Sequence, residues 1–121
     1  MKAWIGAVAL AGVMATGNAM ADGNKLLSQC KIAIRGNAGA DTNDAFQAGL
    51  CFGLVQGVQE TLLAYDNDLP KVKRTCIPDG ITKNQSVKIV YKFLEDNPKY
   101  LHELETILVI AAFQDAFPCK G

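Results

Sequence analysis

Residues 42–64 read TNDAFQAGLCFGLVQGVQETLLA, and their pattern constrains the architecture of the whole chain. The apolar residues recur at helical spacing and fall on nearly every side of the helix. A helix with that pattern is covered by several neighbours, whereas a helix on a protein surface is apolar on one face only. The stretch therefore predicts a helix inside a bundle, capped by Thr42 or Asn43 and ending near Ala64.

A stripe of three glycines runs along this predicted helix. Gly49, Gly53 and Gly57 are four residues apart, so they lie on one face. Each glycine costs about 1 kcal/mol relative to alanine inside a helix, so a compensating contact is expected. The bare stripe lets another backbone approach closely. We expect close packing within the monomer first, and a seam between two copies of the chain as the alternative.

Two further helices are predicted by apolar spacing and by the residues at their ends. Upstream, the spacing predicts a helix from Asn24 to Arg35, and Gly36 ends it. Downstream, Thr82-Lys83-Asn84-Gln85 is a capping box that starts a second helix. The predicted buried face of that second helix consists of Val87, Val90, Tyr91, Phe93 and Leu94.

A last helix is predicted to follow directly, with Asn97 as its N-cap and Pro98 at its first position. It turns apolar all round from Ile107 to Phe113, which is typical of a central core helix or of an oligomer contact. Residues 65–82 hold two prolines and a Pro-Asp-Gly turn, which exclude a long helix there. With no competing strand pattern, the expected fold is all-α, a small bundle of about four helices.

The first 21 residues have the features of a secretory signal peptide. Met1-Lys2 is basic, residues 3–15 are apolar, and Ala19-Met20-Ala21 predicts cleavage after Ala21. The apolar run is too short to span a bilayer, which disfavours the alternative of an uncleaved anchor. The expected mature protein is a single periplasmic domain, residues 22–121, without a membrane contact.

Four cysteines remain in the mature chain, and an even count in a small exported domain indicates two disulfides. Zinc is disfavoured, because spacings of 21, 25 and 43 residues lack the close ligand pairs of a structural site. A nucleophilic cysteine with His102 as base is also disfavoured, because an oxidising compartment consumes the thiols. We expect no metal, no cofactor, and a surface position for His102.

Helix geometry ranks the three possible cysteine pairings. A short connection makes the first two predicted helices antiparallel neighbours, which brings Cys30 within reach of Cys51. The last helix folds back on its predecessor and returns its end toward the loop that holds Cys76, near Cys119. The favoured pairs are therefore Cys30–Cys51 and Cys76–Cys119, and they make the predicted fold a disulfide-stapled bundle.

Charge excludes nucleic acid as a partner. Twelve basic and twelve acidic residues give the 121-residue chain a formal net charge of zero. Lys71, Lys73 and Arg74 form a basic cluster that is too short to follow a phosphate backbone. A solvated surface is the expected role of this cluster, with an acidic partner as the alternative.

Several motifs in fixed order resemble the Rap/Tai family of immunity proteins. The C-terminal half carries Cys76-Ile77-Pro78-Asp79-Gly80-Ile81-Thr82, Gln85, Tyr91-Lys92-Phe93-Leu94, Asn97-Pro98 and Ala116-Phe117-Pro118-Cys119. The segment Cys51-Phe52-Gly53-Leu54-Val55-Gln56-Gly57-Val58 is similar to the family's earlier cysteine and glycine segment. The resemblance extends from Cys30 to Cys119.

This resemblance implies a periplasmic inhibitor that binds, often as a homodimer, over the active-site groove of a papain-like peptidoglycan amidase delivered by type VI secretion. It implies no catalytic residue, in agreement with the absence of an acid–base pair, a triad or a metal set from the sequence. Exposed residues on the helix after Thr82 and on its preceding loop are the candidate partner contacts: Asp79, Lys83, Lys88 and Lys92.

Two other function classes compete with an immunity protein. A periplasmic helical chaperone would bind unfolded clients, but a single histidine and near-neutral charge provide no strong acid trigger. A peptidoglycan hydrolase would need a free cysteine and histidine pair. Binding to one hydrolase separates the first class from the chaperone, and cleavage of peptidoglycan would identify the enzyme.

Overall fold

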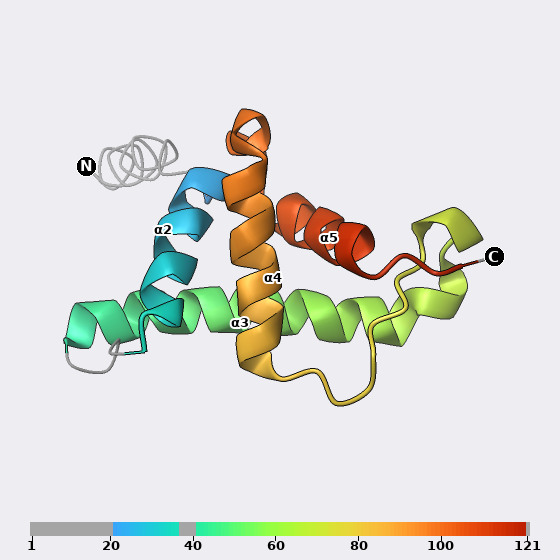
Figure 1. Cartoon of the computed structure of the whole chain (residues 1–121), viewed down its shortest axis with the longest axis horizontal. Coiled ribbons are helices and arrows are strands. Elements are labelled where there is room, and N and C mark those ends of the chain that lie inside the picture. Colours follow the sequence, from blue (N-terminus) through green and yellow to red (C-terminus); the bar gives the residue numbers. More distant parts are fainter. Residues whose placement is uncertain (1–20, 37–40, 121) are drawn as a thin grey trace, which may run out of the picture.

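The computed structural model describes residues 21–36 and 41–120, and four α-helices contain most of them (Figure 1). The α-helices are α2 (Gly23–Ile34), α3 (Thr42–Tyr65), α4 (Lys83–Asp96) and α5 (Glu105–Ala116). Three short 3₁₀ turns connect them: η2 (Asp66–Asp68), η3 (Lys71–Lys73) and η4 (Pro98–Tyr100). The all-α prediction is confirmed, and the predicted signal sequence lies outside the described residues except for Ala21.

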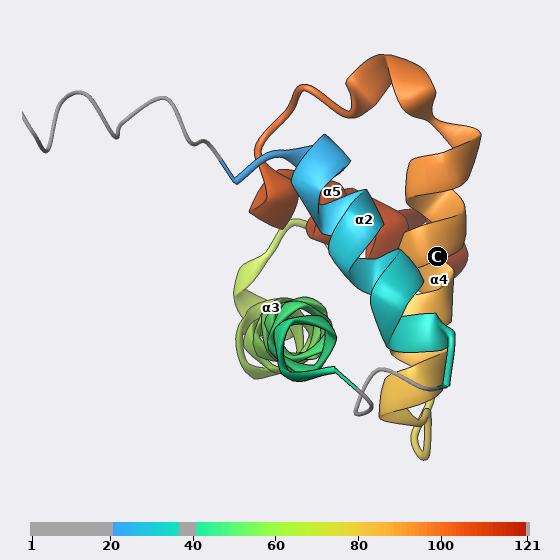
Figure 2. The same ribbon diagram turned by 90° about the vertical axis from the view of Figure 1, so that its left-hand side faces the viewer.

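Helix α3 is the long axis of the molecule, and α4 crosses it (Figure 1). When α3 is viewed along its axis, α2, α4 and α5 all lie to one side of it (Figure 2). Several neighbours pack on α3, as expected, but the expectation that this helix does not lie on the surface is wrong. Its opposite face is open to solvent, where 62% of Phe46 and 40% of Leu50 are exposed. An uncovered apolar face on the longest helix is a candidate contact surface.

The core forms between α3 and the three helices on its covered side. The largest fully buried side chains come from all four helices: Leu26, Val55, Val87, Val90, Leu94, Val109 and Phe113. A buried hydrogen bond of 2.6 Å from the Ser86 hydroxyl to the Gln59 side-chain oxygen joins α4 to α3. Tyr91 and Phe93, predicted to be buried, are only partly covered.

The starts of α4 and α3 differ in how well local sequence predicts them. At α4, the Gln85 amide donates to the Thr82 hydroxyl oxygen and the Gln85 side chain accepts from the Thr82 amide, which confirms the capping box. At α3, Asp41 is the N-cap, because its carboxylate accepts from the amides of Asn43 and Asp44. The prediction that Thr42 or Asn43 caps this helix is wrong.

The last helix begins later than predicted. Asn97 and Pro98 begin the 3₁₀ turn η4 as its cap residue and its first residue, but the Asn97 side-chain amide donates to the Phe93 carbonyl and makes no cap bond, and α5 begins only at Glu105. The intervening backbone holds the start of α2, because the Leu101 and Glu103 carbonyls accept from Asn24 and Gly23, each at 3.1 Å. A continuous helix would use these carbonyls internally, so the docking of α2 explains the break.

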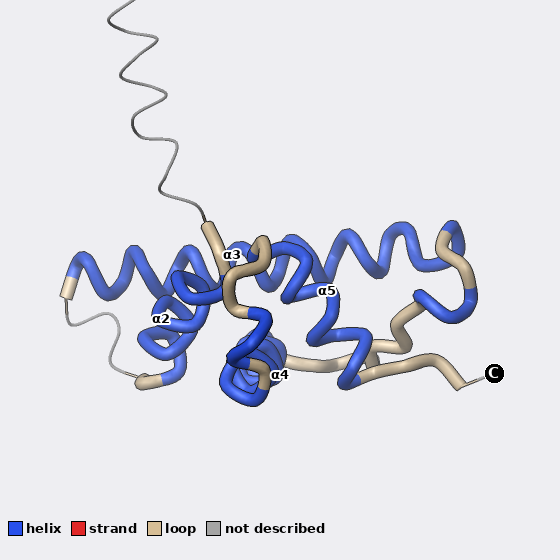
Figure 3. Tube along the Cα trace, turned by 90° about the horizontal axis from the view of Figure 1, so that it is seen from above, coloured by secondary structure: helices blue, strands red, loops and turns tan. Residues whose placement is uncertain are grey.

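Both favoured disulfides are present. Cys30–Cys51 joins α2 to α3 in the core, and Cys76–Cys119 joins the loop before α4 to the C-terminal tail. Beside the second bond, the tail pairs with the loop in an isolated antiparallel bridge between Thr75 and Pro118. In Figure 3 these two loop segments run alongside each other past the end of α5.

Within the described residues, no helix combines the length and apolar character needed to cross a membrane.

Candidate functional site

A cavity of about 500 Å³ opens where the loop before α4, the first half of α4 and the C-terminal tail meet. Its apolar lining comes from Ile81 in the loop, Ile89 on α4 and Phe117 at the end of α5. Its charged lining consists of Asp79 and Lys88. We call this region the α4 site. An apolar floor with two opposite charges at its edge is a typical composition for a protein-binding surface.

The loop of the α4 site is fixed by its backbone at both ends. Gly80 adopts a positive φ of 81°, which makes the sharp turn that Pro78-Asp79-Gly80 predicts. After the turn, the chain enters the capping box at Thr82. Before the turn, the Cys76 amide donates to the Phe117 carbonyl at 2.8 Å, so the loop is tied to the tail.

The structure brings together some of the predicted contact residues and separates others. Asp79 and Lys88 line one cavity, as described above. Lys92 lies one helical turn further along α4, lines a neighbouring cavity of about 310 Å³ and forms an ion pair of 3.2 Å with Asp96. Lys83 is exposed in the first turn of α4 and lines neither cavity. Asp79, Lys88 and Lys92 thus lie on one surface along α4, and Lys83 lies outside it.

Sequence reasoning missed the apolar half of the α4 site. Phe117 belongs to the floor because the bridge to Thr75 and the disulfide to Cys76 hold the tail against the loop. The pairing of Cys76 with Cys119, already favoured from the sequence, was the signal that could have placed Phe117 beside this loop.

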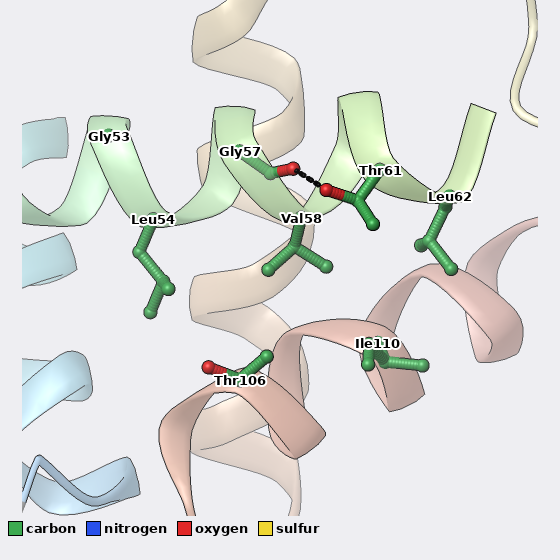
Figure 4. A pocket seen from close by; sticks show the side chains of 8 residues that line it. All are labelled: Gly53, Leu54, Gly57, Val58, Thr61, Leu62, Thr106 and Ile110. Atoms are coloured by element: carbon green, nitrogen blue, oxygen red, sulfur yellow. Dashed lines mark hydrogen bonds between the residues drawn. The ribbon is translucent and has the colours of Figure 1, made fainter. Parts of the chain in front are cut away.

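A second surface is an apolar groove of about 320 Å³ between α3 and α5 (Figure 4). Leu54, Val58 and Leu62 of α3 face Thr106 and Ile110 of α5 across it. Next to this groove, 54% of Ile107 is exposed. Most of the lining is apolar, so covering the groove by a partner would be favourable.

The glycine stripe borders this groove and is not closely packed. A Cβ atom added at Gly49, Gly53 or Gly57 would meet no heavy atom within 4 Å. The expectation that the stripe packs closely within the monomer is therefore wrong, because α2 and α5 border the open hollows beside the stripe without packing against the glycines. The alternative, a seam between two copies, stays a hypothesis.

Charged groups are present at the α2 end of the stripe. Lys25 and Glu105 line a hollow of about 400 Å³ together with Gly49 and Gly53. Partial burial raises the pKa of Glu105, and the positive charge of Lys25 opposes part of this effect. The groove and stripe thus form an apolar strip with a polar end.

The residues that could carry chemistry are engaged in other roles. All four cysteines are in disulfides, so a thiol nucleophile paired with His102 is excluded in this state. His102 is on the surface, as expected, 3.4 Å from the Glu103 carboxylate. Over residues 21–36 and 41–120, no three histidine, cysteine or acidic side chains form a cluster suited to a metal ion.

Comparison with known proteins identifies a family for this chain. Residues 22–119 match the family model of Rap1a immunity proteins. No curated protein and no solved structure matches the chain.

Proposed function

The chain belongs to the Rap1a immunity protein family, and we propose that it is a periplasmic inhibitor of a papain-like peptidoglycan amidase delivered by type VI secretion. The observation that carries the proposal is the family match over residues 22–119, which includes all four helices and both disulfides. The family supports an immunity function. The amidase as target is the finer part of the proposal, and it comes from the resemblance of the sequence motifs.

The α4 site is the proposed inhibitory surface. Its loop projects beyond the helices at the foot of α4 (Figure 1), which is a suitable shape for insertion into an active-site groove. The turn at Gly80, the capping box and the disulfide to the tail hold this loop in one conformation. A loop that is ordered before binding loses less entropy when it binds.

Export is the proposed route to the compartment of this target. Residues 1–21 have the pattern of a signal peptide, and the family match begins at residue 22. Two disulfides suit an oxidising compartment such as the periplasm. We expect the mature protein to begin at Asp22, which mass spectrometry of the protein recovered from periplasm would measure.

A homodimer through the glycine stripe and the α3–α5 groove is part of the proposal. The stripe has open space above it, and Phe46 and Leu50 leave apolar area uncovered on the same helix. A Gly53→Leu variant is expected to fold as a monomer, while a Lys99→Gln variant on η4 keeps the native mass. Light scattering coupled to gel filtration measures the molar mass of each variant. A folded Gly53→Leu variant with the native mass would rule out the seam.

The target is tested by capture. The oxidised protein, residues 22–121, is immobilised and exposed to secreted and periplasmic proteins of its own organism and its neighbours. The expected result is one dominant amidase whose cleavage of peptidoglycan stops on capture. A mixed set of unfolded proteins would indicate a chaperone instead, and cleavage by the immobilised protein alone would indicate an enzyme.

The binding surface is tested with a matched pair of charge reversals. Lys88→Glu changes the edge of the α4 site, and Lys99→Glu makes the same charge change on η4. We expect Lys88→Glu to weaken capture by about tenfold or more and Lys99→Glu to leave it unchanged, because a charge reversal acts most strongly inside the contact. Equal effects of the two variants would place the contact elsewhere.

A further inference from the structure

The two disulfides differ in their access to solvent. Cys30 and Cys51 are fully buried, with 0% of each residue exposed. Cys76 is exposed and Cys119 is half-buried, and both line a hollow of about 260 Å³ at the surface. A thiol can therefore reach the second bond while the fold is intact, whereas the first bond is covered by the core.

The hollow beside Cys76–Cys119 is rich in positive charge. Lys71, Arg74 and Lys120 line it, together with one carboxylate, Asp66. None of the three cations takes part in the ion pairs found among the described residues. Asp66 has its own partner, because its Oδ1 accepts from the Thr75 amide at 3.1 Å.

Arg74 is held at the edge of this hollow by the backbone. Its Nε donates to the Leu69 carbonyl at 2.9 Å and its Nη2 donates to the Asn67 carbonyl at 3.1 Å. Because carbonyls satisfy these donors without neutralising the charge, the positive potential near the disulfide is a fixed part of the structure.

Positive surroundings favour thiol–disulfide exchange in two ways. They attract an anionic thiolate to the bond, and they stabilise the thiolate that leaves. We propose that Cys76–Cys119 is a site of exchange with small anionic thiols, and that its opening frees the loop of the α4 site. The exchange itself is independent of the proposed function, while its effect on a partner rests on that function.

The exchange is a two-electron reduction by two thiols. The first thiolate attacks the Cys76 sulfur and the bond to Cys119 breaks, so a mixed disulfide forms at Cys76 and Cys119 leaves as a thiolate beside Lys120. The second thiolate attacks the sulfur of the first thiol and releases Cys76. The two cysteines take up two electrons and two protons, and the two thiols become one disulfide.

Opening the bond removes the strongest link between loop and tail. The link that remains at this point is the isolated bridge from Thr75 to Pro118, which includes the Cys76 amide to Phe117 carbonyl bond, and before the bridge the Gln114 side chain donates to the Lys73 carbonyl at 2.9 Å. Phe117 is the aromatic part of the floor beneath the loop, so its release widens the α4 site. Cys30–Cys51 stays closed and continues to hold α2 on α3.

The order of opening is the first measurement. The oxidised protein, residues 22–121, is incubated with reduced glutathione, quenched with an alkylating agent at intervals and mapped by peptide mass spectrometry. We expect Cys76 and Cys119 to be modified at least tenfold faster than Cys30 and Cys51. Equal rates, or faster modification of the buried pair, would overturn the proposal.

The preference for an anionic thiol is measured with matched lysine variants. A Lys71→Gln/Lys120→Gln variant is expected to open more slowly with both thiols, because the leaving thiolate is less stabilised, and the slowing is expected to be at least about threefold larger with anionic glutathione than with 2-mercaptoethanol. Lys31→Gln is the control, because Lys31 follows Cys30 in the sequence as Lys120 follows Cys119. If the double variant slows neither thiol, the cationic hollow has no role in exchange, and if it slows both thiols equally, the preference for an anionic thiol is overturned.

The release of the loop is measured without any partner. Hydrogen exchange in a Cys76→Ser/Cys119→Ser variant is expected to be faster in residues 76–82 and unchanged in α2 and α3. An unchanged loop would overturn the coupling, and so would loss of protection throughout the chain. Because no amidase is involved, failure here is distinct from failure of the proposed function, which the capture experiment reports.

Discussion

Two glycines with the same intrinsic helix propensity have opposite roles in this structure. At Gly23, in the first turn of α2, a Cβ atom would lie 2.9 Å from the Leu101 carbonyl oxygen and would collide with the Leu108 side chain. At Gly57, in the middle of α3, the same atom would meet nothing within 4 Å. Gly23 is required for the approach of two backbones, while Gly57 leaves part of α3 bare.

Alanine substitution separates these roles. We expect Gly23→Ala to lower the free energy of unfolding by about 1–3 kcal/mol, because backbone atoms must move to accept the new methyl group. Gly57→Ala is the control, and in samples dilute enough to be monomeric it should raise the free energy of unfolding by about 1 kcal/mol through helix propensity. Urea denaturation followed by circular dichroism measures both, and a stabilising Gly23→Ala would contradict the close approach of α2 to Leu101.

At the scale of single elements, the starts of the helices show what local sequence determines. Both hydrogen bonds of the α4 capping box join Thr82 and Gln85, which are three residues apart, so no distant contact is needed to form them. The segment before α3 offers Asp41, Thr42, Asn43 and Asp44 in succession, all of them residues that cap helices well. Only the backbone at Asp41 is extended, with φ −127° and ψ 133°, and that selects the cap.

Threonine stands at the start of both helices, Thr82 at α4 and Thr42 at α3, but only Thr82 is a cap. Thr82→Ala should lower the free energy of unfolding by about 1 kcal/mol, because the Gln85 amide loses its acceptor. Thr42→Ala should change it by less than about 0.5 kcal/mol, because Thr42 is not a cap. Thermal unfolding measures both variants, and an equal loss for Thr42→Ala would mean that the cap of α3 is shared.

Local signals therefore predicted the helices and most of their ends, and the errors come from distant contacts. The break before α5 depends on Asn24 and Gly23, whose partners Leu101 and Glu103 lie far along the chain. The open glycine stripe depends on which side of α3 its neighbours occupy, which no pattern within α3 specifies. In the α4 site, Asp79 and Lys88 were predicted from local exposure, whereas Phe117 enters from the tail.

At the scale of the whole molecule, the disulfides divide the chain into two linked parts. Cys30–Cys51 closes a separation of 21 residues inside the core, and Cys76–Cys119 closes 43 residues at the surface. Doubling a loop adds only about 0.6 kcal/mol to its closure entropy, so loop length does not decide which bond matters more. Burial decides which disulfide contributes more to stability, because the core loses packed sulfur atoms when Cys30 and Cys51 are replaced.

A comparison of two double variants tests this ranking. Cys30→Ala/Cys51→Ala should lose about 3 kcal/mol from the cross-link and about 1 kcal/mol more for each cavity. Cys76→Ser/Cys119→Ser, at the surface, should lose less in total. Denaturant unfolding of the two proteins beside the native chain measures the difference, and a larger loss for the surface pair would mean that the tail, and not the α2–α3 contact, limits stability.

The docking of α2 on the segment before α5 also determines when the fold can close during synthesis. The Asn24 side chain and its acceptor, the Leu101 carbonyl, are 77 residues apart, so the contact that seats α2 joins nearly the first described residue to the last quarter of the chain. Contacts of such long range form slowly, because the entropy of closing a long loop is lost before the contact stabilises the chain. A ribosome must therefore have synthesised almost the entire polypeptide before the fold can close. Under the export that we propose, the chain passes unfolded through a translocation channel, and this delay keeps it competent for passage until Leu101 has been made.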